Sequence, residues 1–376
     1  MYTLQSLQDP IFLMLYGGVA MLAMLAGIYL WLTRCFGINP EVMPSRTLRR
    51  WTAAFFITAA MSHLWWYVLG VYWLADERLE RDITAIALDH ITLVPLVMSM
   101  LLRMLQDRQR RLWPWIVAQV PTAVIAVEGF ITHNTDCMDI MHYWQVAVIS
   151  TFVAYYIYAL IQYGRWLREN YADLEHKEVW QSLLFVVVLF VVYEIYSTNP
   201  GVMSREYLAQ LNTVAIVAFL LWRVETLQQL DVKEEEEQPV AEGQEETDNA
   251  NVSIPSNIGT LLQVYCEKPQ LYLQHDLTLT QLCEQLGTNR TYMGQYFVQQ
   301  DITYNAYING LRIDHFERLY RDAIAKSRTF TVQQLAHESG FRSYSTFATA
   351  FKQLKGQTAT EWMRQQTGYQ PTVSRE

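Results

Sequence analysis

The stretch VQQLAHESGFRSYSTFATAFKQLKGQTATEW, residues 332–362, decides the fold of the C-terminal part of the chain. Residues 332–339 form a short amphipathic run, Gly340 follows it, and a second run carries apolar Phe347 and Phe351 four positions apart. Glycine can adopt the left-handed conformation that ends a helix and turns the chain. A four-residue apolar spacing is typical of one helix face. The stretch therefore predicts two short helices joined by a turn, the helix-turn-helix layout.

The same order of features occurs once before, which indicates an internal repeat. Between the two copies, residues 305–325 carry apolar residues at helical spacing, so we expect one longer helix to join the two units. The apolar matched residues are expected to form the core, with Cys283 on a buried helix face. The matched pairs, 53 to 55 residues apart, are Leu282 with Leu335, Gly287 with Gly340, Met293 with Phe347, Phe297 with Phe351, Thr303 with Thr358 and Tyr307 with Trp362.

Three segments carry a family resemblance: LCEQLGTNRTYMGQYF from Leu282, YINGLRIDHFERLY from Tyr307, and the stretch 332–362. Together they resemble the DNA-binding domain of the AraC/XylS-type transcription regulators. The resemblance is confined to the C-terminal third of the chain. It implies that the linking helix holds the two helix-turn-helix units so that they reach successive major grooves on one face of DNA.

The sequence departs from the family pattern at the surface. The segment VQQD, residues 298–301, lacks the glycine that usually follows the second helix of the first unit. Gln295 and Thr349 stand where the family often has a basic residue, and Ala359 replaces a frequent proline. We expect an intact fold with its own sequence preference.

The candidate DNA-binding residues lie early on the second helix of each unit, where exposed side chains face base edges. Arg can bond a guanine edge at two points, and Asn or Gln can do the same with adenine. Contacts with phosphate, or pairing within the domain, are expected for Lys352, Lys355 and Arg312. For Arg312, the alternative partners are carbonyls or acids of the linking helix. The candidates are Asn289, Arg290, Thr291, Tyr292, Gln295, Arg342, Tyr344, Ser345, Thr346, Thr349 and Lys352.

Charge divides the chain into three parts. Residues 1–223 carry 15 Lys/Arg and 17 Asp/Glu, residues 224–255 carry 1 Lys and 10 acids, and residues 256–376 carry 12 Lys/Arg and 10 acids, giving −2, −9 and +2. The acidic middle part lacks aromatic residues and predicts a flexible linker over 224–255. A net charge of +2 predicts modest non-specific affinity for DNA, which calls for dimerisation or for locally concentrated sites. We expect a homodimer when the protein is active. The DNA-binding domain is predicted over 256–370.

The first 223 residues predict a membrane domain, because a span of the bilayer needs roughly 20 mostly apolar residues in a helix. The expected fold is therefore all-α, with a seven-helix transmembrane bundle followed by the double helix-turn-helix domain. Gln210 and Asn212 make the last span the weakest, so a six-span alternative stays open. The candidate spans are residues 11–33, 51–75, 83–102, 112–130, 141–162, 179–198 and 207–222.

The distribution of Lys and Arg in the short loops predicts the orientation. The loops after the first, third and fifth spans hold 11 basic residues and the opposite face holds 3, namely Arg78, Arg81 and Arg205. This split predicts a multi-pass protein of the inner, cytoplasmic membrane with its N-terminus outside and its C-terminal domain in the cytoplasm.

Polar residues within the spans are the candidate sensing residues, because such groups are costly in lipid. They line a candidate site for a small-molecule or ion signal, with snorkelling or hydrogen bonding between helices as the alternative. We predict no metal site and no cofactor, since the four cysteines form no CxxC pair and all lysines lie outside the spans. The candidate sensing residues are His63, Asp89, His90, Glu128 and Glu194.

These features predict a membrane-bound, sequence-specific transcription regulator that binds double-stranded promoter DNA and is not an enzyme. The alternative is a membrane transporter or enzyme whose state is reported by a fused DNA-binding domain. A membrane anchor without sensing is a third interpretation of the same sequence.

Overall fold

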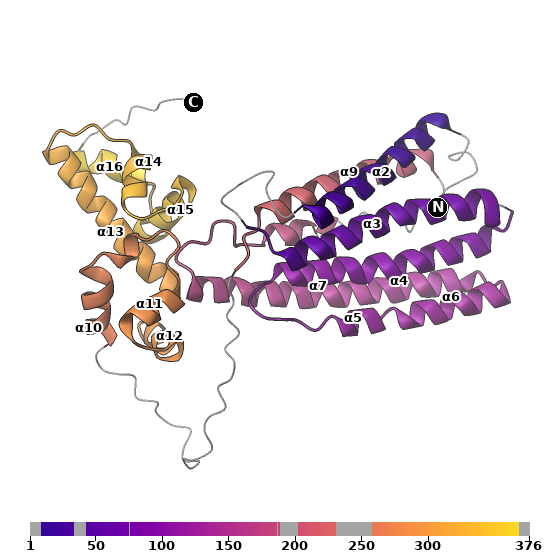
Figure 1. Ribbon diagram of the computed structural model, residues 1–376, viewed down its shortest axis with the longest axis horizontal. Coiled ribbons are helices and arrows are strands. Elements are labelled where there is room, and N and C mark those ends of the chain that lie inside the picture. Colours follow the sequence, from indigo (N-terminus) through magenta and orange to yellow (C-terminus); the bar gives the residue numbers. More distant parts are fainter. Residues whose placement is uncertain are drawn as a thin grey trace, which may run out of the picture. The chain divides into compact units, whose positions relative to one another are not determined.

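The computed structural model shows an all-α protein, as the sequence predicts (Figure 1). Over its described residues it contains helices, their connections and two isolated bridges, but no strand. The chain divides into two compact units. Unit 1 comprises Met1–Tyr163 and His176–Lys233, and unit 2 comprises Gly164–Glu175 and Glu234–Glu376. The structure describes residues 9–33, 43–74, 76–185, 187–188, 202–230 and 258–367.

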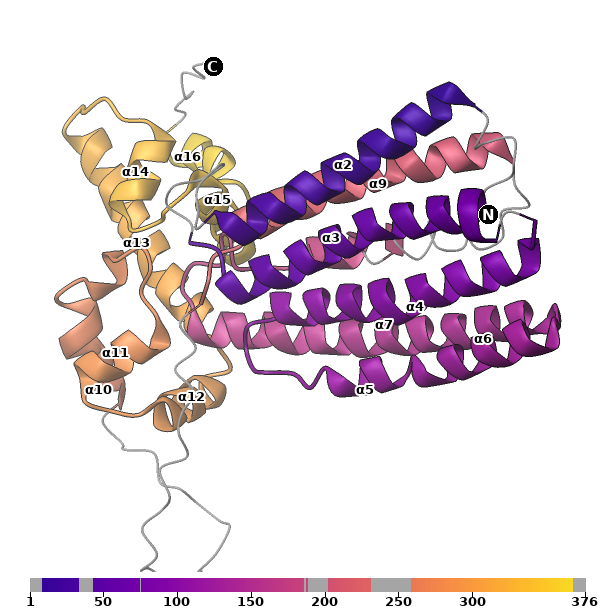
Figure 2. The ribbon, with the colours of Figure 1, turned by 45° about the vertical axis from the view of Figure 1, so that its right-hand side comes forward.

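Unit 1 is built from long helices that run side by side (Figures 1 and 2). Helix α2 packs against α3 and α9, α3 packs against α4, and α4 packs against α6. The helices are α2 (Pro10–Leu32), α3 (Arg46–Val68) with its π-helical continuation η1 (Leu69–Trp73), α4 (Arg78–Met104), α5 (Trp113–Val117), α6 (Val120–Thr132), α7 (Asp136–Asn170) and α9 (Met203–Thr226).

Six helices in the described part of the chain are long and apolar enough to cross a membrane, by length and composition. They correspond to the first five predicted spans and to the seventh. The seventh is longer than the sequence predicts, because α9 runs from Met203 to Thr226. Its polar Gln210 is buried and lies 3.0 Å from Nε2 of His63, so this polar side chain is accommodated within the bundle. The predicted sixth span, residues 179–198, lies largely outside the described residues.

The predicted fourth span, residues 112–130, is not one continuous helix. Helix α5 ends at Val117 and α6 begins at Val120, with Pro121 in its first turn. Proline has no N–H to donate and restricts the residue before it, so a helix often restarts at such a position. The interruption divides the span without removing its apolar character, because Trp113–Thr132 as a whole remains long and apolar enough to cross a membrane.

Many apolar side chains of unit 1 point outward. In the most apolar window of each candidate span, between 22% and 50% of the residues are buried. On α2 alone, Met14, Met21 and Trp31 are more than half exposed. A water-soluble protein rarely leaves such large apolar areas uncovered, so this surface favours an apolar environment around the helices.

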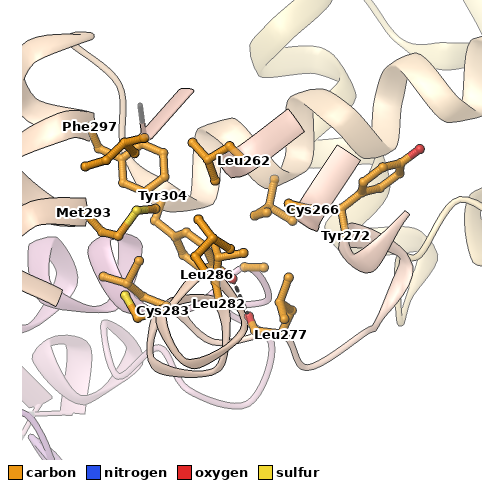
Figure 3. Packing of buried hydrophobic residues seen from close by; sticks show 14 residues of the cluster. Leu262, Cys266, Tyr272, Leu277, Leu282, Cys283, Leu286, Met293, Phe297 and Tyr304 are labelled. Carbon is orange, nitrogen blue, oxygen red and sulfur yellow. Dashed lines mark hydrogen bonds between the residues drawn. The ribbon is translucent and has the colours of Figure 1, made fainter. Parts of the chain in front are cut away.

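Unit 2 contains shorter helices around two apolar clusters. The first cluster gathers Leu282, Met293 and Phe297, and the second gathers Phe347 and Phe351 with their neighbours (Figure 3 shows the first). The helices are α10 (Ile258–Leu262) with its π-helical continuation η2 (Gln263–Glu267), the 3-10 turn η3 (Leu271–Leu273), α11 (Leu279–Leu286), α12 (Arg290–Gln299), α13 (Tyr304–Ala325), α14 (Val332–Glu338), α15 (Tyr344–Lys355) and α16 (Ala359–Thr367).

The core residues predicted from the repeat are confirmed. Leu282, Leu335, Met293, Phe297, Phe347, Phe351 and Trp362 are all buried, and Cys283 lies on the buried face of α11. The long linking helix is also confirmed as α13. Of the predicted acidic linker, residues 224–226 continue α9 as a helix, and residues 231–255 lie outside the part of the chain that the structure describes.

Candidate nucleic-acid interface

The first helix-turn-helix unit is defined by local hydrogen bonds at its helix ends. The side chain of Thr278 accepts from the N–H of Gln281 and that of Gln281 accepts from the N–H of Thr278, which forms a capping box at the start of α11. Gly287 ends α11 in the left-handed conformation, with φ of 63°. Asn289 caps α12, because its side-chain oxygen accepts from the N–H of Tyr292 at 2.9 Å. These contacts fix where the second helix begins.

The second unit repeats this construction. Thr331 caps α14, Gly340 makes the turn with φ of 94°, and the side chain of Ser343 caps α15 by accepting from the N–H of Thr346 at 3.3 Å. Gly356 then ends α15 in the left-handed conformation. Both units therefore use a hydroxyl or amide cap before the second helix.

The missing glycine of the first unit is replaced by an aspartate. Asp301 has φ of 53° and stands 55 residues before Gly356, so the two residues make equivalent turns after α12 and α15. Asp tolerates the left-handed region better than most residues with a side chain. The departure from the family pattern thus changes the residue at the turn but preserves the turn itself.

Arg312 holds together parts of unit 2 that are far apart in the sequence. Its side chain is fully buried and donates to the carbonyl oxygens of Tyr272 at 2.8 Å, Gln274 at 2.6 Å and His275 at 3.3 Å. Burial lowers the pKa of Arg312 to about 10, which leaves the guanidinium charged at neutral pH. Its predicted alternative as a phosphate contact is wrong, because the group is buried. The intradomain role is confirmed, with carbonyls of the loop before α11 as partners instead of groups on the linking helix.

Gly340 is the point where the second unit meets that same loop. A Cβ atom at Gly340 would lie 2.8 Å from Cα of Leu273 and 3.1 Å from the carbonyl oxygens of Leu273 and Tyr272. The ring of His275 also contacts the turn, with Nδ1 3.1 Å from the carbonyl oxygen of Gly340. The loop from Tyr272 to His275 therefore links α13 to the turn of the second helix-turn-helix unit.

The predicted DNA-binding residues lie on α12 and α15 or in the turns just before them. Thr291, Tyr344, Ser345, Thr349 and Lys352 are exposed, as is the capping residue Asn289. The others, Arg290, Tyr292, Gln295, Arg342 and Thr346, are half-buried. Their contact with DNA remains a prediction. Lys355, the other predicted phosphate or pairing residue, forms an ion pair with Glu317 at 2.6 Å.

Both candidate arginines have acceptors within unit 2. Arg342 forms an ion pair with Asp276, with Nη1 3.3 Å from Oδ2. Arg290 donates through Nη2 to the side-chain oxygen of Asn170. The repeat provided no signal for Asp276 or Asn170, because neither lies within the matched helices. Each contact uses one terminal nitrogen of the guanidinium, Nη1 of Arg342 and Nη2 of Arg290.

Two of the predicted sensing residues take part in polar contacts on α3. The carboxylate of Asp89, on α4, accepts from Ser62 Oγ at 2.5 Å and from Trp66 Nε1 at 2.8 Å. His63 has Nδ1 2.8 Å from the carbonyl oxygen of Ala59 and Nε2 3.0 Å from the side chain of Gln210. These contacts connect α3 with α4 and with α9.

The other sensing candidates are not gathered at Asp89. His90 is buried and interacts electrostatically with His142 of α7, while Glu128 is exposed on α6. Glu194 lies outside the described residues. In the described part of the chain, no group of three or more His, Cys, Asp or Glu side chains is arranged to hold a metal ion.

Comparison with known proteins supports the assignment of the C-terminal units. Residues 282–365 match the family described as a helix-turn-helix domain. A TCP pilus virulence regulatory protein of Vibrio cholerae serotype O1 is 28% identical over 106 residues, which cover 27% of this chain and 37% of that protein; two strains carry it. An uncharacterised HTH-type transcriptional regulator of Staphylococcus aureus (strain COL) is 26% identical over 100 residues, which cover 26% of this chain and 12% of that protein.

The chain thus spans little more than a third of the length of the first of these relatives and less of the other. No solved structure matches the chain. The matched region contains both turns, both second helices and the linking helix described above. The C-terminal domain of this chain is therefore a helix-turn-helix domain of the AraC/XylS type.

Proposed function

We propose that the chain is a membrane-bound transcription regulator that binds promoter DNA sequence-specifically and senses a signal through its helical membrane domain. One observation carries the proposal. A domain with two helix-turn-helix units stands in the same chain as six helices, counted over the described residues, that are long and apolar enough to cross a membrane. The relatives are named as regulators, which supports the same function for this domain. The proposed division is a membrane domain over 1–223, a linker over 224–255 and the DNA-binding domain over 256–370.

The proposed location is the inner, cytoplasmic membrane, with the N-terminus outside and the DNA-binding domain in the cytoplasm. The outward apolar side chains of unit 1 support contact with lipid. The 11-to-3 distribution of basic residues supports the orientation. Because DNA is present on the cytoplasmic side, this orientation places the DNA-binding domain where it can bind promoter DNA.

The proposed mode of DNA binding places α12 and α15 in successive major grooves. Their exposed early residues would face base edges, and Lys352 would contact phosphate. A single domain with a net charge of +2 gains little from phosphate attraction, so two domains in a homodimer would bind a two-part operator more tightly.

The polar contacts of Asp89 and His63 support sensing within the bundle. A carboxylate held by Ser62 and Trp66 between two helices is costly to bury in an apolar environment. A small molecule or an ion that competes for these donors would change how α3 packs on α4. The same buried carboxylate favours the alternative function, a transporter or enzyme whose state the DNA-binding domain reports.

The test maps DNA bound by the full-length protein in cells. It compares Arg290→Ala/Arg342→Ala with a control, Arg364→Ala, which removes the positive charge of an exposed residue on α16. We expect discrete bound sites for the parent protein and the control and loss of those sites for the double variant. Membrane fractionation and a reporter fused after Glu376 test location.

Binding by the double variant equal to that of the control would contradict the proposed interface. A reporter active only outside the cell would contradict the proposed function. Asp89→Asn separates the two functions: loss of transport or turnover with unchanged DNA binding in response to the signal would favour the alternative.

A further inference from the structure

Unit 2 contains a segment from far upstream of its helix-turn-helix units. Residues Gly164–Glu175 include the last turns of α7 and the loop that follows it, and they cluster with residues Glu234–Glu376. In the predicted topology this loop lies between the fifth and sixth spans on the cytoplasmic side. We call residues 170–173 the docking loop.

The docking loop joins the first helix-turn-helix unit through its main chain. Tyr171 pairs with Thr278 in an isolated antiparallel bridge, and the N–H of Ala172 donates to the carbonyl oxygen of Leu277 at 3.4 Å. The side-chain amide of Asn305, at the start of α13, donates to the carbonyl oxygens of Ala172 at 2.7 Å and Tyr171 at 3.2 Å. These contacts fix the loop against the residues just before α11 and the start of α13.

The loop also adds to the apolar core. Ala172 is fully buried and belongs to the same cluster as Leu282, Met293 and Phe297. Because the methyl group of Ala172 is fully buried, a larger side chain at this position has to displace its neighbours in the cluster. The loop is therefore inserted in the unit and does not merely touch its surface.

The docking loop also places a negative charge, the carboxylate of Asp173, near the buried guanidinium of Arg312. Asp173 is buried and interacts electrostatically with this guanidinium, whose hydrogen-bond acceptors include three main-chain carbonyls. Oδ1 of Asp173 accepts from the N–H of Glu175 at 3.0 Å. A buried cation whose acceptors are neutral is stabilised by a nearby carboxylate. Asp173 of the docking loop therefore stabilises the buried charge of Arg312.

The loop engages a residue that the proposed function assigns to DNA. Asn170 is buried at the end of α7 and its side-chain oxygen accepts from Arg290, the first residue of α12. The bond to buried Asn170 holds the guanidinium of Arg290 beside the docking loop, so this side chain has to move away from Asn170 to extend from α12 into a DNA groove. On this basis, docking of the loop and binding of DNA by α12 oppose each other.

We propose that the first helix-turn-helix unit has a docking surface for the loop 170–173 of the same chain, and that the docked loop holds α12 away from DNA. The inference rests on the proposed function. Because the loop follows directly on α7, a change in the membrane helices has a covalent route to this surface that does not pass through the acidic linker. Release of the loop frees Arg290, and DNA binding in turn favours release. If the loop is docked in about nine-tenths of the molecules, the apparent affinity for DNA is about tenfold weaker than that of the free domain.

The first test uses the full-length protein in nanodiscs of neutral lipid and a duplex enriched by that protein from a random-sequence pool. Ala172→Gln introduces a side chain that the docked loop cannot accommodate, without adding charge. Glu169→Gln, one position before Asn170 but exposed, is the matched control. We expect Ala172→Gln to bind the duplex about tenfold more tightly than the parent protein and the control. Unchanged or weaker binding would overturn the proposal, since the loop would then be neutral or a supporting part of the DNA-competent domain.

The second test locks the loop in place. Tyr171→Cys/Thr278→Cys puts two thiols opposite each other in the antiparallel bridge, where Cα separations suit a disulfide. We expect oxidation to weaken DNA binding at least about tenfold and reductant to restore it. The reduced form serves as the control for both substitutions. Equal binding by the oxidised and reduced forms would overturn the proposal.

The two failures are distinguishable. If every form, including reduced protein and Ala172→Gln, ignores all duplexes at low salt, the proposed function fails and the inference fails with it. If every form binds DNA with one affinity, the proposed function stands and only the role of the docking loop is refuted.

Discussion

Replacing Gly340 by alanine should damage unit 2 far more than the same change at Gly287, although both glycines make equivalent turns. Gly287 has φ of 63° and open space where a Cβ atom would lie, so Gly287→Ala carries only the backbone strain of an L-residue in the left-handed region, about 1–2 kcal/mol. Gly340 has φ of 94°, and its new Cβ would lie 2.8 Å from Cα of Leu273. Overpacking against main chain adds about 1–3 kcal/mol, so we expect Gly340→Ala to lose about 2–5 kcal/mol.

The neighbouring main chain has little freedom to move aside, because Arg312 binds the carbonyl oxygens of Tyr272, Gln274 and His275. The loop that would have to shift also links α13 to the turn of the second unit. Gly340→Ala should therefore disturb the spacing of α12 and α15 as well as stability, and so weaken binding to a two-groove duplex.

Hydrogen exchange of unit 2 amides in the full-length protein measures the free energy of opening for both variants under one set of conditions. For a domain of this size, a loss of about 2 kcal/mol lowers the unfolding temperature by roughly 8 °C or more. Duplex binding is measured on the same samples. Equal losses of stability for Gly340→Ala and Gly287→Ala would refute the reasoning, because the contact with Leu273 would then add nothing to the backbone strain.

Three further predictions concern unit 2. Arg312→Met leaves buried carbonyls without their donor and should lower the free energy of unfolding by urea by about 3–5 kcal/mol. Arg312→Lys should recover part of this loss. A loss smaller than that of a surface substitution would contradict the structural role of Arg312. Asp301→Gly should stabilise unit 2 by about 0.5–1 kcal/mol by relieving positive φ, as Gly356 does in the second unit, and a lower unfolding temperature would contradict this. Burial, together with the charge of Arg318, lowers the pKa of His315, so the unfolded chain binds a proton more readily than the folded one. The free energy of unfolding therefore falls as the pH drops below about 6.5. His315→Gln should flatten this pH dependence, and an unchanged slope would contradict the prediction.

Local sequence signals were sufficient for the four helices of the two helix-turn-helix units and for the linking helix. The apolar spacing of Met293 with Phe297 and of Phe347 with Phe351 identified the core faces, because residues four apart lie on one side of a helix. For the caps, Ser343 could be recognised, whereas Thr288 and Asn289 were both candidates before α12 and the structure shows Asn289. Length and hydropathy identified the apolar helices in the same way, although not the break between α5 and α6.

The partners of polar side chains were decided by the tertiary structure. Sequence spacing suggested phosphate or the linking helix for Arg312, but its carbonyl acceptors lie 37 to 40 residues away along the chain. Likewise, Arg290 finds Asn170 at a separation of 120 residues, and His63 finds Gln210 at 147. A periodic pattern reports which face of a helix is buried, but it carries no information on which distant segment covers that face. The sequence by itself determined the two helix-turn-helix units and the six apolar helices of the described residues, because both follow from local spacing and composition. Only the folded chain decided that Arg290 on α12 binds Asn170 at the end of α7, because that pair joins segments far apart in the sequence.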